Sequence, residues 1–207
     1  MLTLYYHPRT CSLGVQIALL EAGIAHELVE TERTIARSEF LKINSLGTVP
    51  ALATDAGVLT ETSAIMCWLA LNYPTAKLLP QDTFGFANGV SLLSWLSSSA
   101  HIARRQMRFP TRFTTSNTGL TEIKESGSRE FTKFLEHMDA ILAKNKYLLA
   151  DDQPSACDYQ LMVYANWCAI DELSTRDFEN FERWKNSMVQ RPMTHKALKI
   201  VQSPLIH

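Results

Sequence analysis

The apolar pattern of this chain changes once, after Tyr73, and this change limits the folds that are open to it. Before it, short apolar runs alternate with short helical segments; beyond it, apolar residues recur about every 3.6 positions. Strands that alternate with helices form a sheet covered by helices, whereas helices alone bury their apolar faces against one another. The sequence therefore predicts an α/β part followed by an all-helical part.

The first part contains both strand and helix patterns in alternation. Their predicted order is strand 2–6, helix 12–22, strand 26–30, helix 38–43, strands 49–53 and 58–59, and helix 62–72. The Asp55-Ala56-Gly57 sequence between the last two strands is typical of a hairpin turn. We expect a small mixed sheet with helices, formed by a domain of residues 1–77.

The second part contains only helix patterns. Helices are predicted at 86–107, 122–144, 155–170, 178–190 and 193–201. Residues 78–85, within a stretch with two prolines and no periodicity, are the predicted linker, and residues 86–207 the predicted helical domain. Ser155 and Asp158 have the spacing of a capping box, which would start the helix that follows.

Composition excludes several classes of function. The net charge of −1 does not favour nucleic acid or an anionic membrane as a partner, and no apolar stretch reaches the roughly 20 residues of a membrane helix. The N-terminus lacks the pattern of a signal peptide, so we expect a cytoplasmic protein with free thiols. No metal is expected, because no His/Cys cluster has ligand spacing.

Cys11 differs from the other three cysteines, which lie inside apolar helical patterns. It stands between a predicted strand and a predicted helix, where backbone N–H groups are unpaired and the helix dipole favours an anion. A thiolate is the reactive form of cysteine, so we expect the pKa of Cys11 to lie below about 8.5. A buried cysteine at the end of a strand is the alternative.

Two further segments have features of a peptide-binding site. A cis bond between Val49 and Pro50 would turn the Val49 backbone groups outward to pair with an extended peptide; a trans proline at a strand edge is the alternative. Thr62 can cap the helix that follows it and, with the free N–H groups there, bind a carboxylate, while Glu61 can bind an ammonium group. A threonine that only caps the helix is the alternative.

These segments together resemble a known family. A cysteine at the first strand–helix junction, NSLGTVPAL at 44–52, LTETSAI at 59–65 and a helical second half resemble the cytosolic glutathione transferases along essentially the whole chain. TyrTyrHisPro followed by CysSerLeu resembles the bacterial beta class of that family. The resemblance implies a thioredoxin-like N-terminal domain, an all-α C-terminal domain, glutathione as co-substrate and a homodimer.

The resemblance also implies residues for the sulfur site. Cys11 would contact the glutathione sulfur, with Ser12 beside it and Tyr6 near by. The beta class places a histidine of the helical domain near this cysteine, and His101 is the match; alignment on a preceding tryptophan would put Arg104 there instead. A protonated histidine or an arginine would each favour a thiolate.

The two ends of glutathione have separate implied partners. Val49 would pair with the peptide backbone ahead of cis-Pro50, and Glu61 and Thr62 would hold the γ-glutamyl end. The lysine that the class often uses for the glycyl carboxylate is missing. Arg33 or Arg37 could replace it, and the sequence does not decide between them.

A run of arginines, Arg104, Arg105 and Arg108, has two interpretations. Arg104 and Arg108 share a helix face and could attract an anionic co-substrate to the cleft. A solvated or dimer-facing stripe is the more common role of such a run.

The expected reaction is attack of the glutathione thiolate on a small hydrophobic electrophile, whose pocket we expect around residues 101–107 and Phe109. A glutathione-dependent thiol–disulfide oxidoreductase or a reductive dehalogenase is one alternative. A non-catalytic transferase-like binding protein is another, but such proteins commonly lose the residues of the sulfur and γ-glutamyl sites, which this chain has.

Overall fold

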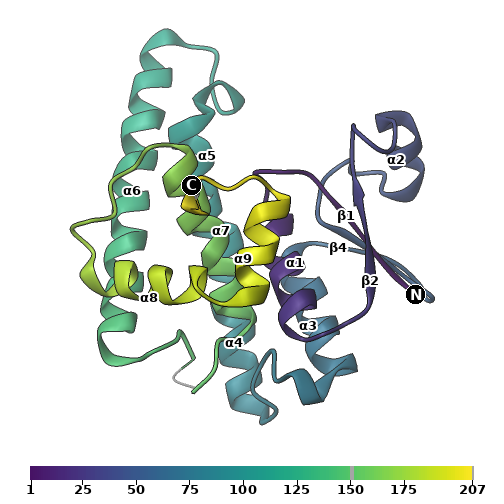
Figure 1. The fold of residues 1–207 in the computed structure, drawn as a ribbon. Helices are drawn as coiled ribbons and strands as arrows, with labels where there is room; N and C mark the ends of the chain where they lie inside the picture. The colour runs from purple at the N-terminus through teal and green to yellow at the C-terminus, as the bar shows by residue number, and fades with distance from the viewer. Residues whose placement is uncertain (150–151, 207) are drawn as a thin grey trace.

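The fold begins with a four-stranded mixed sheet in the order β2-β1-β3-β4 (Figure 1). The computed structural model describes residues 1–149 and 152–206. Strand β1 is parallel to β2 and antiparallel to β3, which forms a hairpin with β4. The strands are β1 (Leu2–Tyr6), β2 (His26–Glu30), β3 (Ala51–Thr54) and β4 (Gly57–Thr60). The predicted strands are thus confirmed, with β3 beginning two residues later than expected.

Helices α1 (Ser12–Glu21), α2 (Arg37–Ile43) and α3 (Thr62–Asn72) complete the first part. Helix α1 makes the crossover between β1 and β2, the connection that a parallel pair requires. Its residues from Ser12 to Leu19 are all buried, because the sheet part lies on one side of it and α7 and α9 on the other (Figure 1). This two-sided burial explains why its sequence is apolar around the whole circumference.

Gly14 allows α1 and the helical part to approach closely. A Cβ atom at this position would lie 2.5 Å from Gln160 Oε1 and 3.2 Å from the Tyr159 carbonyl oxygen, both in α7. A side chain at this position would have to displace the Gln160 side chain and press against the backbone of α7. The fixed distance between α1 and α7 determines how the two parts meet, and the residue just before α1 is Cys11.

The second part is a bundle of helices in which the 28-residue α6 lies along α5 and α7 lies in the centre (Figure 1). The helices are α4 (Thr83–Trp95), α5 (His101–Arg108), α6 (Asn117–Lys144), α7 (Ala156–Ile170), α8 (Glu179–Val189) and α9 (Pro192–Ile200). Single 3-10 turns lie at Pro74–Ala76, Pro110–Arg112 and Pro204–Ile206. The thioredoxin-like fold followed by a helical part, as predicted, is confirmed. None of the helices in the described residues is long and apolar enough to span a membrane.

The helix predicted at 86–107 is interrupted by a π-helical turn, Leu96–Ala100, between α4 and α5. A π turn releases a backbone carbonyl from its normal partner and rotates the residues that follow. Tyr164 of α7 donates its hydroxyl to the Leu96 carbonyl, so a buried side chain of the central helix binds the wide turn. The turn therefore determines which side chains of α5 face the sheet part.

The capping box predicted at Ser155 and Asp158 is confirmed. Asp158 is fully buried and accepts from the Ser155 N–H at 2.9 Å. It also accepts from the Leu148 N–H at 3.1 Å and from Trp184 Nε1 at 3.0 Å, so it joins α7 to α8 and to the segment before it.

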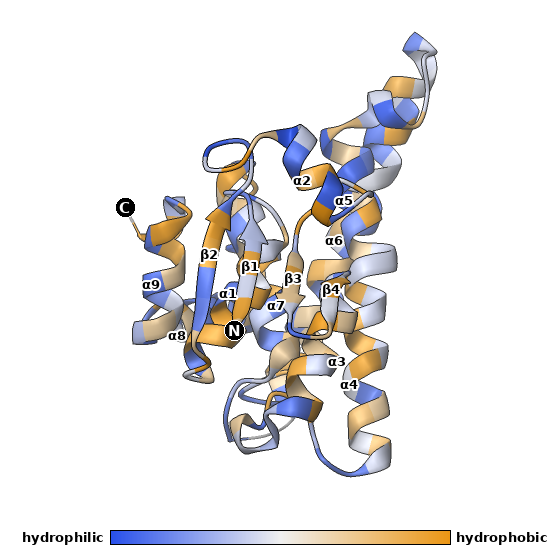
Figure 2. Cartoon of the chain, turned by 90° about the vertical axis from the view of Figure 1, so that its right-hand side faces the viewer, coloured by the Kyte–Doolittle hydropathy of each residue, from blue (hydrophilic) through white to orange (hydrophobic). Residues whose placement is uncertain are grey.

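The predicted linker, residues 78–85, contains the buried Leu78 and Leu79 and the start of α4. Its boundaries stay a prediction. Figure 2 shows both apolar and polar residues on the strands, whereas α5 carries strongly hydrophilic residues. These polar residues of α5 belong to the site described next.

Candidate active site

Two adjoining pockets lie between the sheet part and the helical part, and both contain Cys11 and Val49. The large pocket, of about 600 Å³, extends from them toward Trp167 of α7. The small pocket, of about 370 Å³, extends toward Glu61 and Thr62. A ligand with its centre at Cys11 can therefore reach both sides of the contact between the two parts.

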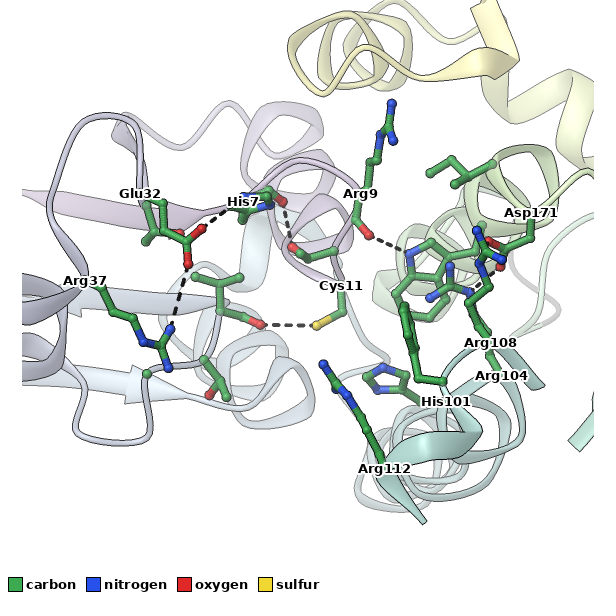
Figure 3. A pocket seen from close by; sticks show the side chains of 18 of the residues that line it. His7, Arg9, Cys11, Glu32, Arg37, His101, Arg104, Arg108, Arg112 and Asp171 are labelled. Carbon is green, nitrogen blue, oxygen red and sulfur yellow. Dashed lines mark hydrogen bonds and ion pairs between the residues drawn. The ribbon is translucent and has the colours of Figure 1, made fainter. Parts of the chain in front are cut away.

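Cys11 directly precedes α1, and its Sγ donates to the Val49 carbonyl oxygen at 3.3 Å (Figure 3). Burial raises the pKa of Cys11 to about 11, although the nearby Thr62 hydroxyl lowers it, and Glu61 adds a smaller increase. The predicted thiolate is therefore wrong for this structure: loss of water around the sulfur outweighs the favourable helix start. At neutral pH the Cys11 side chain is a neutral hydrogen-bond donor.

The other cysteines are not part of the site. Burial raises the pKa of Cys168 to about 12, and it also raises the pKa of Cys67 and of Cys157. Cys157 and Cys168 are buried and line neither pocket, nor does Cys67. The distinction between Cys11 and the rest made from sequence thus agrees with their positions.

The bond between Val49 and Pro50 is cis, the arrangement that the family resemblance implied. Val49 lines both pockets and Pro50 lines the small one. The loop before them is held by Asn44, a buried side chain whose Nδ2 donates to the Thr48 carbonyl at 2.8 Å. The Val49 backbone is therefore part of the pocket wall beside Cys11.

Glu61, and not Thr62, occupies the N-cap position of α3, so the predicted threonine cap is wrong. Thr62 is the first residue of the helix, is buried, and lies beside Cys11 in the small pocket. Glu61 has a φ of 66°, in the left-handed region that is uncommon for residues other than glycine. Arg9 and Glu32, which line the large pocket, also have a positive φ; the other three such non-glycine residues of the described chain lie outside both pockets.

Tyr6 and Ser12, implied by the resemblance, do not line either pocket. Tyr6 is buried on β1, and its hydroxyl donates to Glu30 Oε2 at 3.4 Å. Burial raises the pKa of Tyr6, and the neighbouring Glu30 raises it further. Ser12 is fully buried, and its hydroxyl is 2.7 Å from Thr10 Oγ1. The Ser12 hydroxyl is thus paired within the loop that carries Cys11, while the Tyr6 hydroxyl joins β1 to β2.

His101 lines both pockets, as the family match implied, and Figure 3 shows it beside Cys11. Burial lowers the pKa of His101 to about 4, with further contributions from Arg105, Arg104 and Arg112. Its ring is therefore neutral at neutral pH. Of the two groups that would favour a thiolate, a protonated histidine and an arginine, the histidine is thus uncharged here, and positive charge in this region comes from the arginines.

Arg104 lines the pockets but is directed away from the sulfur. Its Nε donates to Asp171 Oδ2 at 2.9 Å, and its guanidinium lies 4.2 Å from the centre of the Trp167 ring. Arg108 forms a second ion pair with Asp171 at 3.1 Å. Trp167 in turn donates from Nε1 to the Arg9 carbonyl at 2.9 Å, which connects the two parts of the chain across the pocket. Of the two candidates, His101 is therefore the one beside Cys11 in Figure 3.

Arg37 lines the large pocket, where it lies 3.8 Å from Glu32. Arg33 is exposed, pairs with Glu30 at 3.4 Å and does not line the pocket. Of the two arginines that could replace the missing lysine, Arg37 therefore lies at the pocket and Arg33 does not. No cluster of His, Cys, Asp or Glu that could hold a metal occurs in residues 1–149 and 152–206.

Sequence reasoning missed Arg9, Glu32, Arg112 and Trp167 as pocket residues. Arg112 lies four residues after the run of Arg104, Arg105 and Arg108, and its distance from Cys11 along the chain gives no sign of their proximity. Trp167 has the spacing of a core residue of α7, and it is indeed buried. Only the packing of α1 against α7 brings these residues together.

Comparison with known proteins gives the family. A family model described as "Glutathione S-transferase, N-terminal domain" matches residues 11–77. The chain is 27% identical to glutathione S-transferase GstA of Escherichia coli O157:H7, over 94% of this chain and 96% of that protein. It is 31% identical to a solved beta-class glutathione S-transferase of Sphingomonas chungbukensis, with a TM-score of 0.83 and coverage of 96% and 98%. The chain belongs to the glutathione transferase family.

The similarity of this transferase to its relatives extends over both parts of the chain. A glutathione transferase homologue from Sulfitobacter, solved with bound glutathione, has a TM-score of 0.85 and 26% identity, with coverage of 97% of this chain and 98% of that chain. The two pockets therefore lie in a fold that binds glutathione in a related protein.

Proposed function

We propose that this protein joins glutathione to small organic electrophiles, with the glutathione sulfur held at the Cys11 thiol. The observation that carries the proposal is the position of Cys11. Its neutral S–H group points to the Val49 carbonyl at the junction of two pockets, one suited to a peptide and the other to a second substrate. The relatives named glutathione S-transferases support the same function.

Glutathione would extend from the small pocket into the large one. Glu61 would face the γ-glutamyl ammonium, and the start of α3 at Thr62 would face its carboxylate. The Val49 backbone would pair with the cysteinyl residue. Arg37 would bind the glycyl carboxylate, because it lines the large pocket.

The reaction follows from the protonation of Cys11. A neutral thiol can leave the Val49 carbonyl and donate to the glutathione sulfur, and a donor at this position favours the glutathione thiolate. The thiolate then attacks the electrophilic carbon; a C–S bond forms and the leaving group departs with its electron pair. Disulfide exchange is less favoured at neutral pH, because it requires deprotonated Cys11.

Substitutions of Cys11 test this role. With 1-chloro-2,4-dinitrobenzene, Cys11→Ser should keep most of kcat, because a hydroxyl also donates to the thiolate. Cys11→Ala should lose about tenfold or more, since donors of this type typically contribute at least that much. Glutathione affinity should largely survive in both, because Val49, Glu61 and Thr62 hold the rest of the tripeptide. Cys67→Ala, outside both pockets, is the matched control.

The contrary result is equally specific. If Cys11→Ser loses as much kcat as Cys11→Ala while the wild-type protein rapidly reduces glutathione mixed disulfides at neutral pH, Cys11 acts as a nucleophile. The oxidoreductase alternative would then replace conjugation.

We also propose the homodimer that the family resemblance implies, and a cytoplasmic location, where Cys11 would stay reduced. Light scattering during gel filtration would give a mass of twice 23.3 kDa for the dimer. A peak at the mass of a single chain would reject it.

A further inference from the structure

We propose that the electrophile accepted by the large pocket is an anion, a planar molecule whose carboxylate binds Arg112. This inference rests on the proposed function and adds the charge class of the second substrate. The reacting carbon would lie at the glutathione sulfur beside Cys11, and the carboxylate would lie on the side of the helical part.

The large pocket has an excess of positive charge. Two acidic side chains, Glu32 and Asp171, line it together with five arginines: Arg9, Arg37, Arg104, Arg108 and Arg112. Asp171 pairs with two of these arginines, at 2.9 and 3.1 Å, and Glu32 lies 3.8 Å from a third. The two carboxylates of the pocket therefore already pair with arginines, and the positive charge of the remaining arginines, Arg9 and Arg112, is available to a ligand.

In Figure 3 the guanidinium of Arg112 extends toward Cys11 and His101, whereas the side chain of Arg9 extends away from them. Arg112 lines both pockets, and no acidic side chain in the described part of the chain pairs with it. Its guanidinium lies 5.1 Å from the centre of the Phe109 ring, which leaves the N–H groups free for an anion. A carboxylate there would gain charge-assisted hydrogen bonds.

The surroundings of Arg112 suit the remainder of such a molecule. Phe109 is 41% exposed and, with Ile170, gives the large pocket an apolar surface. The neutral His101 does not add competing charge, because burial, with a smaller contribution from the neighbouring arginines, lowers its pKa to about 4. The large pocket can thus hold both the planar apolar body of such a molecule and its terminal carboxylate.

Glutathione's own glycyl carboxylate does not account for Arg112. In Figure 3 Arg37 extends from the sheet part and Arg112 from the helical part, on different sides of Cys11. The sheet part holds the predicted glutathione contacts, so Arg37 serves glutathione and Arg112 the second substrate. The two roles separate experimentally, because loss of Arg112 should leave the KM for glutathione nearly unchanged.

The test uses ligands that differ only in charge: 3,5-dinitrobenzoate and its uncharged amide, 3,5-dinitrobenzamide. Their affinities are measured by calorimetry in the presence of saturating S-methylglutathione, which occupies the peptide site without reacting. The wild-type protein should bind the carboxylate about tenfold more tightly, as expected for one charge-assisted contact. Arg112→Gln should remove this preference, while Arg176→Gln, an exposed arginine outside both pockets, should keep it.

Equal affinity of the wild-type protein for the two ligands, or a preference that survives in Arg112→Gln, would overturn the inference. Turnover is measured separately with 4-chloro-3,5-dinitrobenzoate and its amide, each relative to its uncatalysed rate. In this reaction the C–S bond forms, the C–Cl bond breaks, and chloride leaves with the electron pair. If the protein turns over neither compound, the proposed function is rejected. The ratio of the two binding affinities would still decide the charge preference.

Discussion

Cys11 is the residue on which the chemistry of the site depends, because both pockets meet at its thiol. Two local effects act on it in opposite directions: the start of α1 favours an anion, and burial disfavours one. Burial is the larger effect and raises the pKa to about 11. The residues that cause this burial come from distant parts of the chain, so the position of Cys11 could be predicted from sequence but its protonation could not.

The rate of alkylation of Cys11 should therefore show no plateau near neutral pH. Since thiolate is the reactive form, the rate should rise about tenfold per pH unit between pH 7 and 9. Mass spectrometry of iodoacetamide-treated protein measures the rate for each cysteine peptide. Cys157 and Cys168 are buried and should react more slowly than Cys11 at every pH. A plateau for Cys11 below pH 8 would restore the thiolate that the sequence predicted.

At the level of elements, the N-terminus of α7 connects much of the helical part. Asp158 accepts hydrogen bonds from four groups: the Ser155 N–H and hydroxyl, the Leu148 N–H and Trp184 Nε1–H. Each would be left buried without its acceptor if the carboxylate were removed. Asp158 lines neither pocket, so we expect it to stabilise the helical part and not to bind substrate.

Asp158→Ala should lower the free energy of unfolding by about 3 kcal/mol, because it removes a helix cap and leaves two further buried donors unpaired. Asp82→Ala is the matched control: among the described residues, the Asp82 side chain accepts only from the Gly85 N–H, at the exposed start of α4, so its loss should cost about 1 kcal/mol. Denaturant unfolding and glutathione titration are measured on the same variants. Unchanged stability with lost glutathione binding would place Asp158 in the site.

Elements of the fold were predictable from sequence to different degrees. Strand β1 and helix α3 have the predicted bounds, since β1 is a short apolar and aromatic run that ends before His7-Pro8 and α3 ends before Pro74. The π turn Leu96–Ala100 was not predictable, because a π turn adds only one residue to a helix and barely changes the spacing of its apolar residues. Its partner, the Tyr164 hydroxyl, lies in another helix. The direction of the α5 side chains, and hence the neutral state of His101, depended on this missed turn.

At the scale of the whole molecule, α1 holds the sheet part and the helical part together. Besides its buried faces, Glu21 at its end accepts from Arg191 Nε at 3.0 Å and from the Thr194 hydroxyl at 3.0 Å, both at the start of α9. On the side of the pockets, the hydrogen bond from Trp167 to the Arg9 carbonyl also joins the helical part to the sheet part. The two pockets exist only because of this contact, so the arginines of the helical part could not be assigned to a site from sequence alone.

The proposed function requires that glutathione binds across this contact, non-covalently, with its sulfur at the Cys11 thiol. A crystal structure of the protein with reduced glutathione at neutral pH tests this binding mode most directly. We expect the glutathione sulfur within hydrogen-bonding distance of Cys11 Sγ, its backbone paired with Val49, and its γ-glutamyl end at Glu61 and Thr62. A disulfide between glutathione and Cys11, or a γ-glutamyl end placed outside the small pocket, would show that this binding mode is wrong.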